Sequence, residues 1–298
     1  MFYQHSSILF PLLIVIGVAL GLLFIFKSIN KMNIEKGQYE RLIVIFSYSG
    51  IAFYLGARFF DDLFHFINGE PWGKGGITFL GGMISAMVVL IVLFFIFLKP
   101  LRHRFFKIIN IVAMGVILGH AFGRIGCFCA GCCYGKVTDS FIGVNFPGEA
   151  ELRKTKTGEY IIEVTGSSGY KQLFVDKLDE LGYNKNGVYT DFTVINPIFT
   201  EAYNYAENTK LLPTQLIETV FLLSLFGVLF LIKKYQFPLY IIGYGTFRFI
   251  IEFLRSDNRG SVAIGISPSQ LLSILIVVAG IGLIFVYTIL NKKKNIEI

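Results

Sequence analysis

Charged residues are scarce in this sequence of 298 residues: they make up 16% of it, against 54% hydrophobic residues. Soluble domains of this total length would carry more charge, so the composition excludes that class of protein. The net charge of +7 could suggest a nucleic-acid partner, but the basic residues stand in short clusters at the ends of apolar runs. That distribution follows from membrane topology and excludes a nucleic-acid-binding surface.

Other absences narrow the choice further. We expect no cleavable signal peptide, because the first apolar run, residues 7–26, is too long for the hydrophobic core of such a peptide and lacks a small-residue cleavage site. Internal repeats and low-complexity tracts are lacking too. The only four cysteines all lie between residues 127 and 133, so a zinc knot built from two separated pairs has no second pair.

Seven apolar runs are each near the roughly 20 residues that cross the hydrocarbon core as a helix. Basic residues concentrate in loops 27–41, 99–107 and 233–236 and in the tail after 290, which are therefore predicted to be cytoplasmic. The N-terminus then lies outside and the C-terminus inside. The predicted fold is an all-α polytopic membrane protein with spans at about 7–26, 42–60, 77–98, 108–126, 213–232, 237–254 and 268–290.

Residues 137–212 form a polar break between the fourth and fifth spans. The stretch "TKTGEYIIEVTGSSGYKQ" predicts a strand that ends in a Gly/Ser turn, and "KQLFVDKLDELG" predicts a short helix closed by glycine. We expect a small α+β extracytoplasmic cap. The predicted organisation is therefore helices and a signature turn in 1–136, the cap in 137–212, and the last spans with a basic tail in 213–298.

Ionisable residues gather near the outer ends of the spans, where they are costly in lipid and are expected to face a cavity or one another. Several arginines with fewer carboxylates suit an anionic headgroup, because guanidinium binds phosphate through two hydrogen bonds. An Arg–Glu pair four residues apart can equally be a structural bridge that neutralises itself. The residues in question are Arg58, His120, Arg124, Gln215, Glu218, Arg248, Glu252 and Arg255.

Two further features carry open alternatives. Gly81 and Gly82 lie inside the predicted third span, where they indicate either a re-entrant segment beside the headgroup site or tight helix packing. The cysteines in "CFCAGCC" are interpreted as small packing residues in a tight turn, with one disulfide or a metal site as the alternatives. The interpretation as packing residues leads us to expect no metal and no cofactor.

The order of these motifs resembles the bacterial prolipoprotein diacylglyceryl transferase family. "GRIGCFCAGCCYG" is similar to the family signature G-R-x-G-N-F-x-N-G-x-x-x-G. "GARFF", "GGITFLGG", "PTQLIE", "YGTFRFIIEFLR" and "ISPSQLLS" resemble further family stretches in the same order. The resemblance implies transfer of diacylglycerol from phosphatidylglycerol, or a similar anionic phospholipid, to the lipobox cysteine thiol of a prolipoprotein signal peptide.

The resemblance also implies roles for particular residues. Arg124 and Arg248 would hold the phosphate, and Glu252 would orient the site or accept the thiol proton, with His120 as a substitute base. The catalytic set is then Arg248, Glu252 and His120. The substrate-binding set is Arg124, Arg58, Arg255, Gln215, Glu218, Gly81, Gly82, Gly126 and Gly131.

Several positions depart from the family pattern. Phe10, Leu80, Cys127, Ala130 and Cys132 stand where the family has polar residues. The alternative is therefore a non-catalytic lipid-binding or lipoprotein-handling relative that uses the same pocket, and a redox or metal protein built on the cysteines is a third interpretation. The expected location is the bacterial cytoplasmic membrane, with the site facing the outer leaflet.

Overall fold

The chain divides into two compact units in the computed structural model. One unit comprises Met1–Ile25 and Asn110–Ile298, and the other comprises Phe26–Ile109. The boundaries between them fall inside two long helices, α1 (Ser6–Asn30) and α4 (Phe105–Cys129). The structure describes residues 6–67, 71–73, 78–256 and 267–296.

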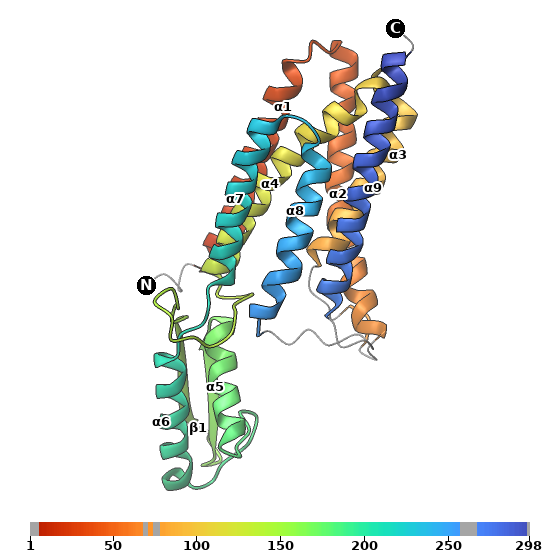
Figure 1. Cartoon of the computed structure of the whole chain (residues 1–298). Coiled ribbons are helices and arrows are strands. Elements are labelled where there is room, and N and C mark those ends of the chain that lie inside the picture. The colour runs from red at the N-terminus through yellow and green to blue at the C-terminus, as the bar shows by residue number, and fades with distance from the viewer. Residues whose placement is uncertain (1–5, 68–70, 74–77, 257–266, 297–298) are drawn as a thin grey trace. The chain divides into compact units, whose positions relative to one another are not determined.

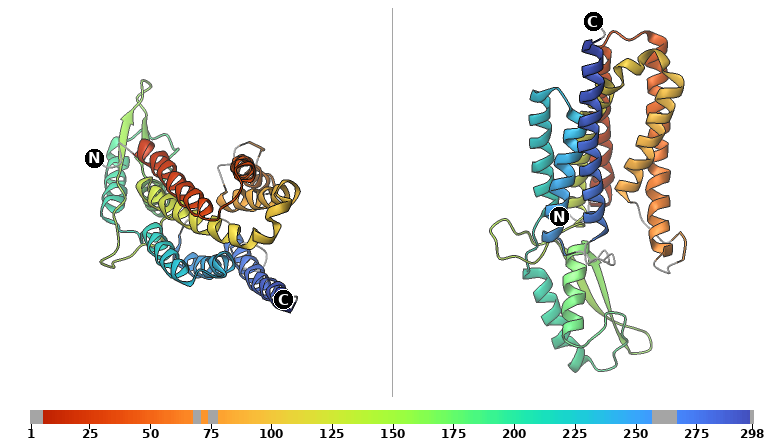
Figure 2. Two further views of the ribbon diagram at one scale, coloured as in Figure 1. Left: turned by 90° about the horizontal axis from the view of Figure 1, so that it is seen from above. Right: turned by 45° about the vertical axis from the view of Figure 1, so that its right-hand side comes forward.

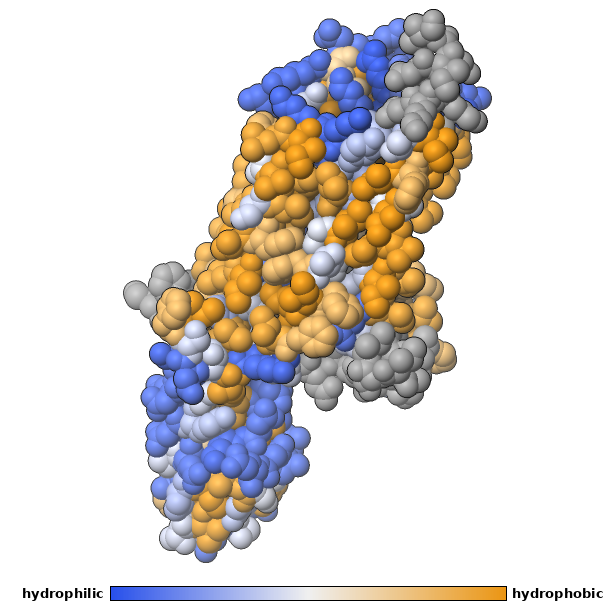
Figure 3. Space-filling model, viewed as in Figure 1, coloured by the Kyte–Doolittle hydropathy of each residue, from blue (hydrophilic) through white to orange (hydrophobic). Residues whose placement is uncertain are grey.

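Long apolar helices dominate both units (Figure 1). Within the described residues, 6 helices are long and apolar enough to cross a membrane, and a shorter apolar helix, Gly81–Phe97, coincides with the third predicted span. Hydrophobic residues cover much of the visible face of these helices in Figure 3, whereas the visible face of the cap is mainly hydrophilic. The prediction of a multi-pass membrane protein is confirmed. The candidate spans are Ile8–Asn30, Lys36–Leu63, Lys99–Cys129, Thr214–Ile232, Gln236–Leu254 and Ser269–Ile289.

The unit Phe26–Ile109 is built on helices α2 (Lys36–Ile67) and α3 (Phe79–Phe97), which pack along each other. A 3₁₀ turn, η2 (Lys99–Arg104), follows them. A Cβ atom on Gly81 would come within 2.5 Å of the Phe60 side chain, and one on Gly82 within 2.8 Å of the Phe53 backbone oxygen. Both glycines therefore lie where α2 and α3 pack closely together.

Glycines also bring α1 and α4 together in the other unit. A Cβ atom on Gly21 would come within 2.5 Å of the Gly115 oxygen, and one on Gly17 within 3.1 Å of the Gly119 oxygen. Small residues four apart on both helices let the backbones approach closely, as is common between membrane helices. This crossing fixes the helix that carries His120 and Arg124.

Three more helices complete the membrane part of this unit: α7 (Thr214–Ile232), α8 (Gln236–Ile251) and α9 (Pro268–Ile296). α8 packs against both α7 and α9, and the views in Figure 2 show the three side by side. Buried residues of α4, α7 and α8 share one apolar core, which includes Ile117, Leu222 and Tyr240. The functional side chains described below project from these helices.

The segment between α4 and α7 contains both strands and helices. Strands β1 (Gly148–Lys154) and β2 (Tyr160–Gly166) form an antiparallel hairpin, and helices α5 (Ser168–Glu180) and α6 (Phe192–Asn208) accompany it (Figure 1). Its core contains Tyr170, Phe174 and Leu178 from α5 with Ile195 and Ala202 from α6. The cap thus has its own buried apolar core, separate from the long apolar helices.

Two helix ends differ from the sequence-based prediction. α4 continues to Cys129, so the first half of the supposed turn between Gly123 and Gly135 is helical. α8 ends at Ile251, and a short 3₁₀ turn, η3 (Glu252–Leu254), follows it. No proline follows either end closely, but Gly131, at φ 63°, stands just past the last turn of α4.

Candidate functional site

Glu218 on α7 is the centre of the first polar group. Its Oε1 atom lies 2.9 Å from Arg124 Nε and accepts a hydrogen bond of 2.9 Å from Tyr244 Oη. His120 Nε2 lies 3.7 Å from the same oxygen. The Glu218 side chain is only 1% exposed, so the Arg124 ion pair and the Tyr244 hydrogen bond replace the water that a carboxylate otherwise needs.

His120 is held on several sides. Its Nδ1 atom lies 3.3 Å from Tyr240 Oη, and its ring packs edge-on against the Tyr244 ring at a centroid distance of 4.7 Å. Arg124 lies one turn further along α4, which brings both residues to the same carboxylate, as their spacing predicts.

Arg248 and Glu252 form the second polar group. Arg248 Nη2 lies 2.9 Å from Glu252 Oε2 and donates to Ser269 Oγ at 3.3 Å. Ser267 Oγ donates to the other oxygen of Glu252 at 2.8 Å. Arg248 Nη1 is buried and has no hydrogen-bond partner among the described residues. This guanidinium therefore keeps a donor available for a ligand oxygen.

The two groups belong to one electrostatic cluster. Glu218 interacts electrostatically with Arg124, His120 and Arg248, while Tyr244 interacts with both arginines. Arg255 interacts with Arg248 as well, and its backbone forms an isolated bridge with Gly135. The guanidinium groups of Arg124 and Arg248 thus both act electrostatically on one carboxylate, that of Glu218, and their joint role in binding a ligand stays a prediction.

Gln215 contributes to the turn that follows α4. Its Nε2 atom donates to the Cys132 carbonyl at 2.5 Å, and Thr214 Oγ1 donates to the Cys133 carbonyl at 2.7 Å. Gln215 Oε1 is buried without a hydrogen-bond partner among the described residues. The start of α7 therefore fixes the backbone of this turn.

Three of the four cysteines converge in this turn. The Sγ atoms of Cys127, Cys132 and Cys133 all lie within 4.8 Å of one another, and no disulfide joins the four cysteines. Hydrogen bonds from the thiols of Cys127 and Cys132 lower the pKa of Cys133. The turn has Gly131 at φ 63° and Cys133 at φ 64°, the left-handed region that a non-glycine residue rarely adopts.

The signature glycines have structural surroundings. A Cβ atom on Gly126 would lie 3.2 Å from the Phe10 ring, and one on Gly131 would lie 2.3 Å from Ser167 Cβ in the cap. Gly131 therefore combines a positive φ with a close approach to the cap, which only glycine allows.

The other predicted residues lie outside this cluster's unit. Arg58 is on α2, and Gly81 and Gly82 are on α3, in the unit Phe26–Ile109. Leu80 is on α3 too, and its side chain lies outside the part that the structure describes. Their roles stay predictions.

Sequence reasoning missed Tyr240 and Tyr244. Both lie on the helical stripe that continues through Arg248, at spacings of four residues, and both contact the Glu218 group. That spacing was the available signal. Tyrosines in an apolar helix ordinarily indicate packing or an interfacial position, so this spacing alone does not single them out.

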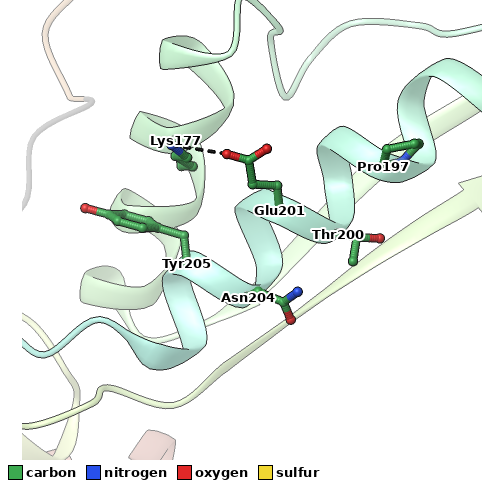
Figure 4. A pocket seen from close by; sticks show the side chains of 6 residues that line it. All are labelled: Lys177, Pro197, Thr200, Glu201, Asn204 and Tyr205. Atoms are coloured by element: carbon green, nitrogen blue, oxygen red, sulfur yellow. Dashed lines mark ion pairs between the residues drawn. The ribbon is translucent and has the colours of Figure 1, made fainter.

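A separate hollow lies on the cap and is shown in Figure 4. It has a volume of about 700 Å³ and opens between α5 and α6. Lys177 lies 3.3 Å from Glu201 and 3.1 Å from Glu180, and its ammonium lies 5.6 Å from the Tyr205 ring centroid. Its cation is balanced by exposed carboxylates, so this hollow lacks the unbalanced charge of the cluster in the helices.

Comparison with known proteins agrees with this arrangement. The sequence model for "Prolipoprotein diacylglyceryl transferase" matches residues 6–286. A phosphatidylglycerol–prolipoprotein diacylglyceryl transferase of Clostridium tetani (strain Massachusetts / E88) is 28% identical over 295 residues, covering 93% of this chain and 92% of the relative. One from Clostridium botulinum (strain Loch Maree / Type A3) is 27% identical over 302 residues, covering 96% of this chain and 94% of the relative.

A shorter match has a similar level of identity. The protein named phosphatidylglycerol–prolipoprotein diacylglyceryl transferase 2 of Clostridium perfringens (strain 13 / Type A) is 30% identical over 199 residues, 64% of this chain and 56% of the relative. The family match spans all the helices that carry the polar cluster and the cap between them. The chain therefore belongs to the prolipoprotein diacylglyceryl transferase family.

Proposed function

We propose that this protein transfers a diacylglyceryl group from phosphatidylglycerol, or a similar anionic phospholipid, to the lipobox cysteine thiol of a prolipoprotein, forming a thioether. The relatives are named for this reaction. The reaction needs cations around the leaving phosphate and an acceptor for the thiol proton. The polar cluster in α4, α7 and α8 offers both kinds of group.

Arg248 carries the proposal. One side of its guanidinium is occupied by Glu252 and Ser269, while the buried Nη1 has no hydrogen-bond partner among the described residues. A phosphate oxygen is the natural acceptor for such a donor, because hydrogen bonds between ions are the strong ones. In this proposal Arg248 binds the phosphate that leaves, and Glu252 with Ser267 keeps the guanidinium in place.

Arg124 and His120 take the supporting roles. Glu218 holds Arg124 through Nε, so Arg124 acts as a second, fixed cation that lowers the energy of the developing phosphate charge. His120 shares the same carboxylate and accepts the thiol proton. Arg255, Arg58, Gln215 and the signature glycines complete the proposed substrate-binding set.

The proposed orientation follows from the basic loops. Seven spans, with the N-terminus outside and the C-terminus in the cytoplasm, place the cluster at the outer leaflet of the bacterial cytoplasmic membrane. The cap then lies on the extracytoplasmic side. The acceptor reaches the site as the membrane-embedded signal peptide of a prolipoprotein, so its own thiol is the nucleophile.

A non-catalytic role in binding lipid or handling lipoproteins is the second candidate. The observation in its favour concerns Phe10, which lies close to Gly126 of the signature. The family has a polar tyrosine at the position of Phe10. Leu80, Cys127 and Ala130 remove further polar groups. In this role Arg248 would still bind the lipid phosphate, but no diacylglyceryl group would be transferred.

Expression in bacterial cells depleted of their own transferase separates the two candidates. Mass spectrometry of a reporter prolipoprotein should show the thioether-linked diacylglyceryl mass with the wild-type chain. The Lys177→Ala variant is the control, because its change lies on the cap surface. Unmodified precursor in cells with correctly inserted wild-type protein would contradict the transferase and favour the binding role.

A further inference from the structure

We propose that Cys127, Cys132 and Cys133 form a three-thiolate zinc site whose open fourth position binds the thiol of the acceptor cysteine. The proposed role in catalysis rests on the transfer reaction described above, whereas binding of the metal does not. Zinc sites with three protein ligands and one open position are the catalytic type, and thiolates are among their usual ligands.

The positions of the sulfur atoms support this assignment. All three Sγ atoms lie within 4.8 Å of one another. Zinc–thiolate bonds of about 2.3 Å in a tetrahedron place the sulfurs roughly 3.8 Å apart, so each sulfur pair needs to approach by at most about 1 Å to complete the site. A cage of four thiols within seven residues would be strained, but only three converge here, and Cys129 is not one of them.

The backbone holds these cysteines in place. The carbonyls of Cys132 and Cys133 accept hydrogen bonds from Gln215 and Thr214, and Cys127 is fixed in the last turn of α4. Cys133 has φ 64°, a conformation that costs energy in a non-glycine residue and is concentrated at functional sites. Packing alone would not need this conformation, because a glycine there would avoid its cost.

The charges nearby suit a zinc–thiolate group. Three thiolates around one divalent cation leave a single negative charge, and a bound acceptor thiolate adds another. Arg124 interacts electrostatically with Cys127 and Cys133, and Arg255 interacts with Cys133. The three cysteines are partly exposed rather than fully enclosed, which leaves room for a fourth ligand.

The site supplies a chemical step that the reaction requires. Coordination to zinc would acidify the acceptor thiol and hold its sulfur as a thiolate, and the released proton would pass to His120 as in the proposed transfer. The sulfur then forms the new S–C bond with the glyceryl carbon of the donor lipid. The C–O bond to phosphate breaks, and the phosphate leaves with that electron pair, bound by Arg248. No oxidant or reductant is needed, and zinc keeps its charge throughout.

Metal analysis of the purified full-length protein tests the site without any assay of activity. The protein is purified in detergent with a phosphine reductant, reconstituted with zinc and measured by mass spectrometry of the metal. We expect one zinc per chain in the wild type and in Cys129→Ser. Cys127→Ser, Cys132→Ser and Cys133→Ser should each lose at least about 100-fold in zinc affinity, more than the loss of an outer-shell partner costs.

Cobalt substitution tests the open position. Cobalt(II) bound by three thiolates gives sulfur-to-metal charge-transfer bands, and a peptide with a lipobox cysteine should change them, whereas the same peptide with alanine should not. Absence of zinc, or equal loss of zinc in Cys129→Ser and Cys133→Ser, would overturn the site. If the charge-transfer bands do not change when the cysteine peptide is added, the proposal that the fourth coordination position binds the acceptor thiol is wrong.

Activity separates this inference from the proposed function. If the protein binds zinc and shows the spectral response but forms no thioether product, the metal site is supported and the proposed transferase activity is contradicted. If all three cysteine variants still transfer the lipid in the presence of a zinc chelator, the proposed transferase activity is supported. The same result would overturn the catalytic role of zinc.

Discussion

The molecule has arginine or lysine paired with glutamate in two very different surroundings. In the cap, Lys177 pairs with Glu180 and Glu201, whose side chains are 69% and 56% exposed. In the helices, Arg248 and Glu252 are each 9% exposed. The same attraction operates in both places, but water screens the cap pairs and is largely excluded from the helix pairs.

This difference in burial shows which charged residues are expected to have a function. Exposed pairs cost little to form and contribute little to stability. Buried pairs carry a desolvation penalty that their mutual attraction only partly offsets, and in a membrane protein such groups are ordinarily functional. The cluster around Glu218 and Arg248 is therefore where function is expected, rather than the hollow on the cap.

The largest effect is expected from Glu218→Gln. It leaves the Arg124 guanidinium buried without its carboxylate, and breaking a buried pair on one side typically costs about 3–5 kcal/mol. The thermal unfolding midpoint in detergent should fall clearly. Glu201→Gln makes the same chemical change at an exposed carboxylate of the cap and should leave the midpoint unchanged. Equal midpoints for both variants would show that burial does not distinguish the two regions.

Arg248→Ala should come next. Loss of one charge-stabilising donor typically lowers a catalytic rate by about 10²–10³-fold, so transfer to the reporter prolipoprotein should fall by that order. Arg248→Lys keeps the charge without the planar fork and should recover only part of the rate. A transfer rate in Arg248→Ala equal to the wild type, measured by mass spectrometry over time, would mean that the phosphate binds elsewhere.

Tyr244→Phe should have an intermediate effect. It removes the hydroxyl that donates to Glu218 at 2.9 Å, and hydrogen bonds to charged groups contribute about 1.5–3 kcal/mol. The unfolding midpoint should drop less than in Glu218→Gln, because the Arg124 ion pair remains. A drop as large as that of Glu218→Gln would indicate that the tyrosine, rather than the carboxylate, organises the cluster.

Lys177→Ala should have the smallest effect. The ammonium is flanked by exposed carboxylates and contacts only the cap. We expect no measurable change in transfer or in the unfolding midpoint. A loss of transfer here, in a protein that folds normally, would move the site toward the hollow in Figure 4.

Much of the helical architecture could be predicted from the sequence. Apolar length locates the helices, because crossing a membrane demands a long uninterrupted apolar run. The pairing of Arg248 with Glu252 followed from their spacing of four residues on one helix. Contacts within a single helix depend only on its period, which the sequence records.

Contacts between helices could not be predicted in this way. The pairing of Arg124 with Glu218 joins α4 to α7, and it depends on how the two helices are rotated against each other. The convergence of Cys127 with Cys132 and Cys133 depends on where α4 ends and on a left-handed residue in the turn. Gly131, at φ 63°, marks the end of α4, where the Cys132 backbone N–H donates to the Cys127 carbonyl, but the positive φ at Cys133 carries no residue type that signals it.

The most direct test of the account is a density map of the protein in a lipid bilayer containing phosphatidylglycerol. We predict a lipid phosphate within hydrogen-bond distance of Arg248 Nη1, between α8 and the helices that carry Arg124 and Glu218. A headgroup bound elsewhere, with Arg248 contacting only Glu252 and Ser269, would contradict the central claim.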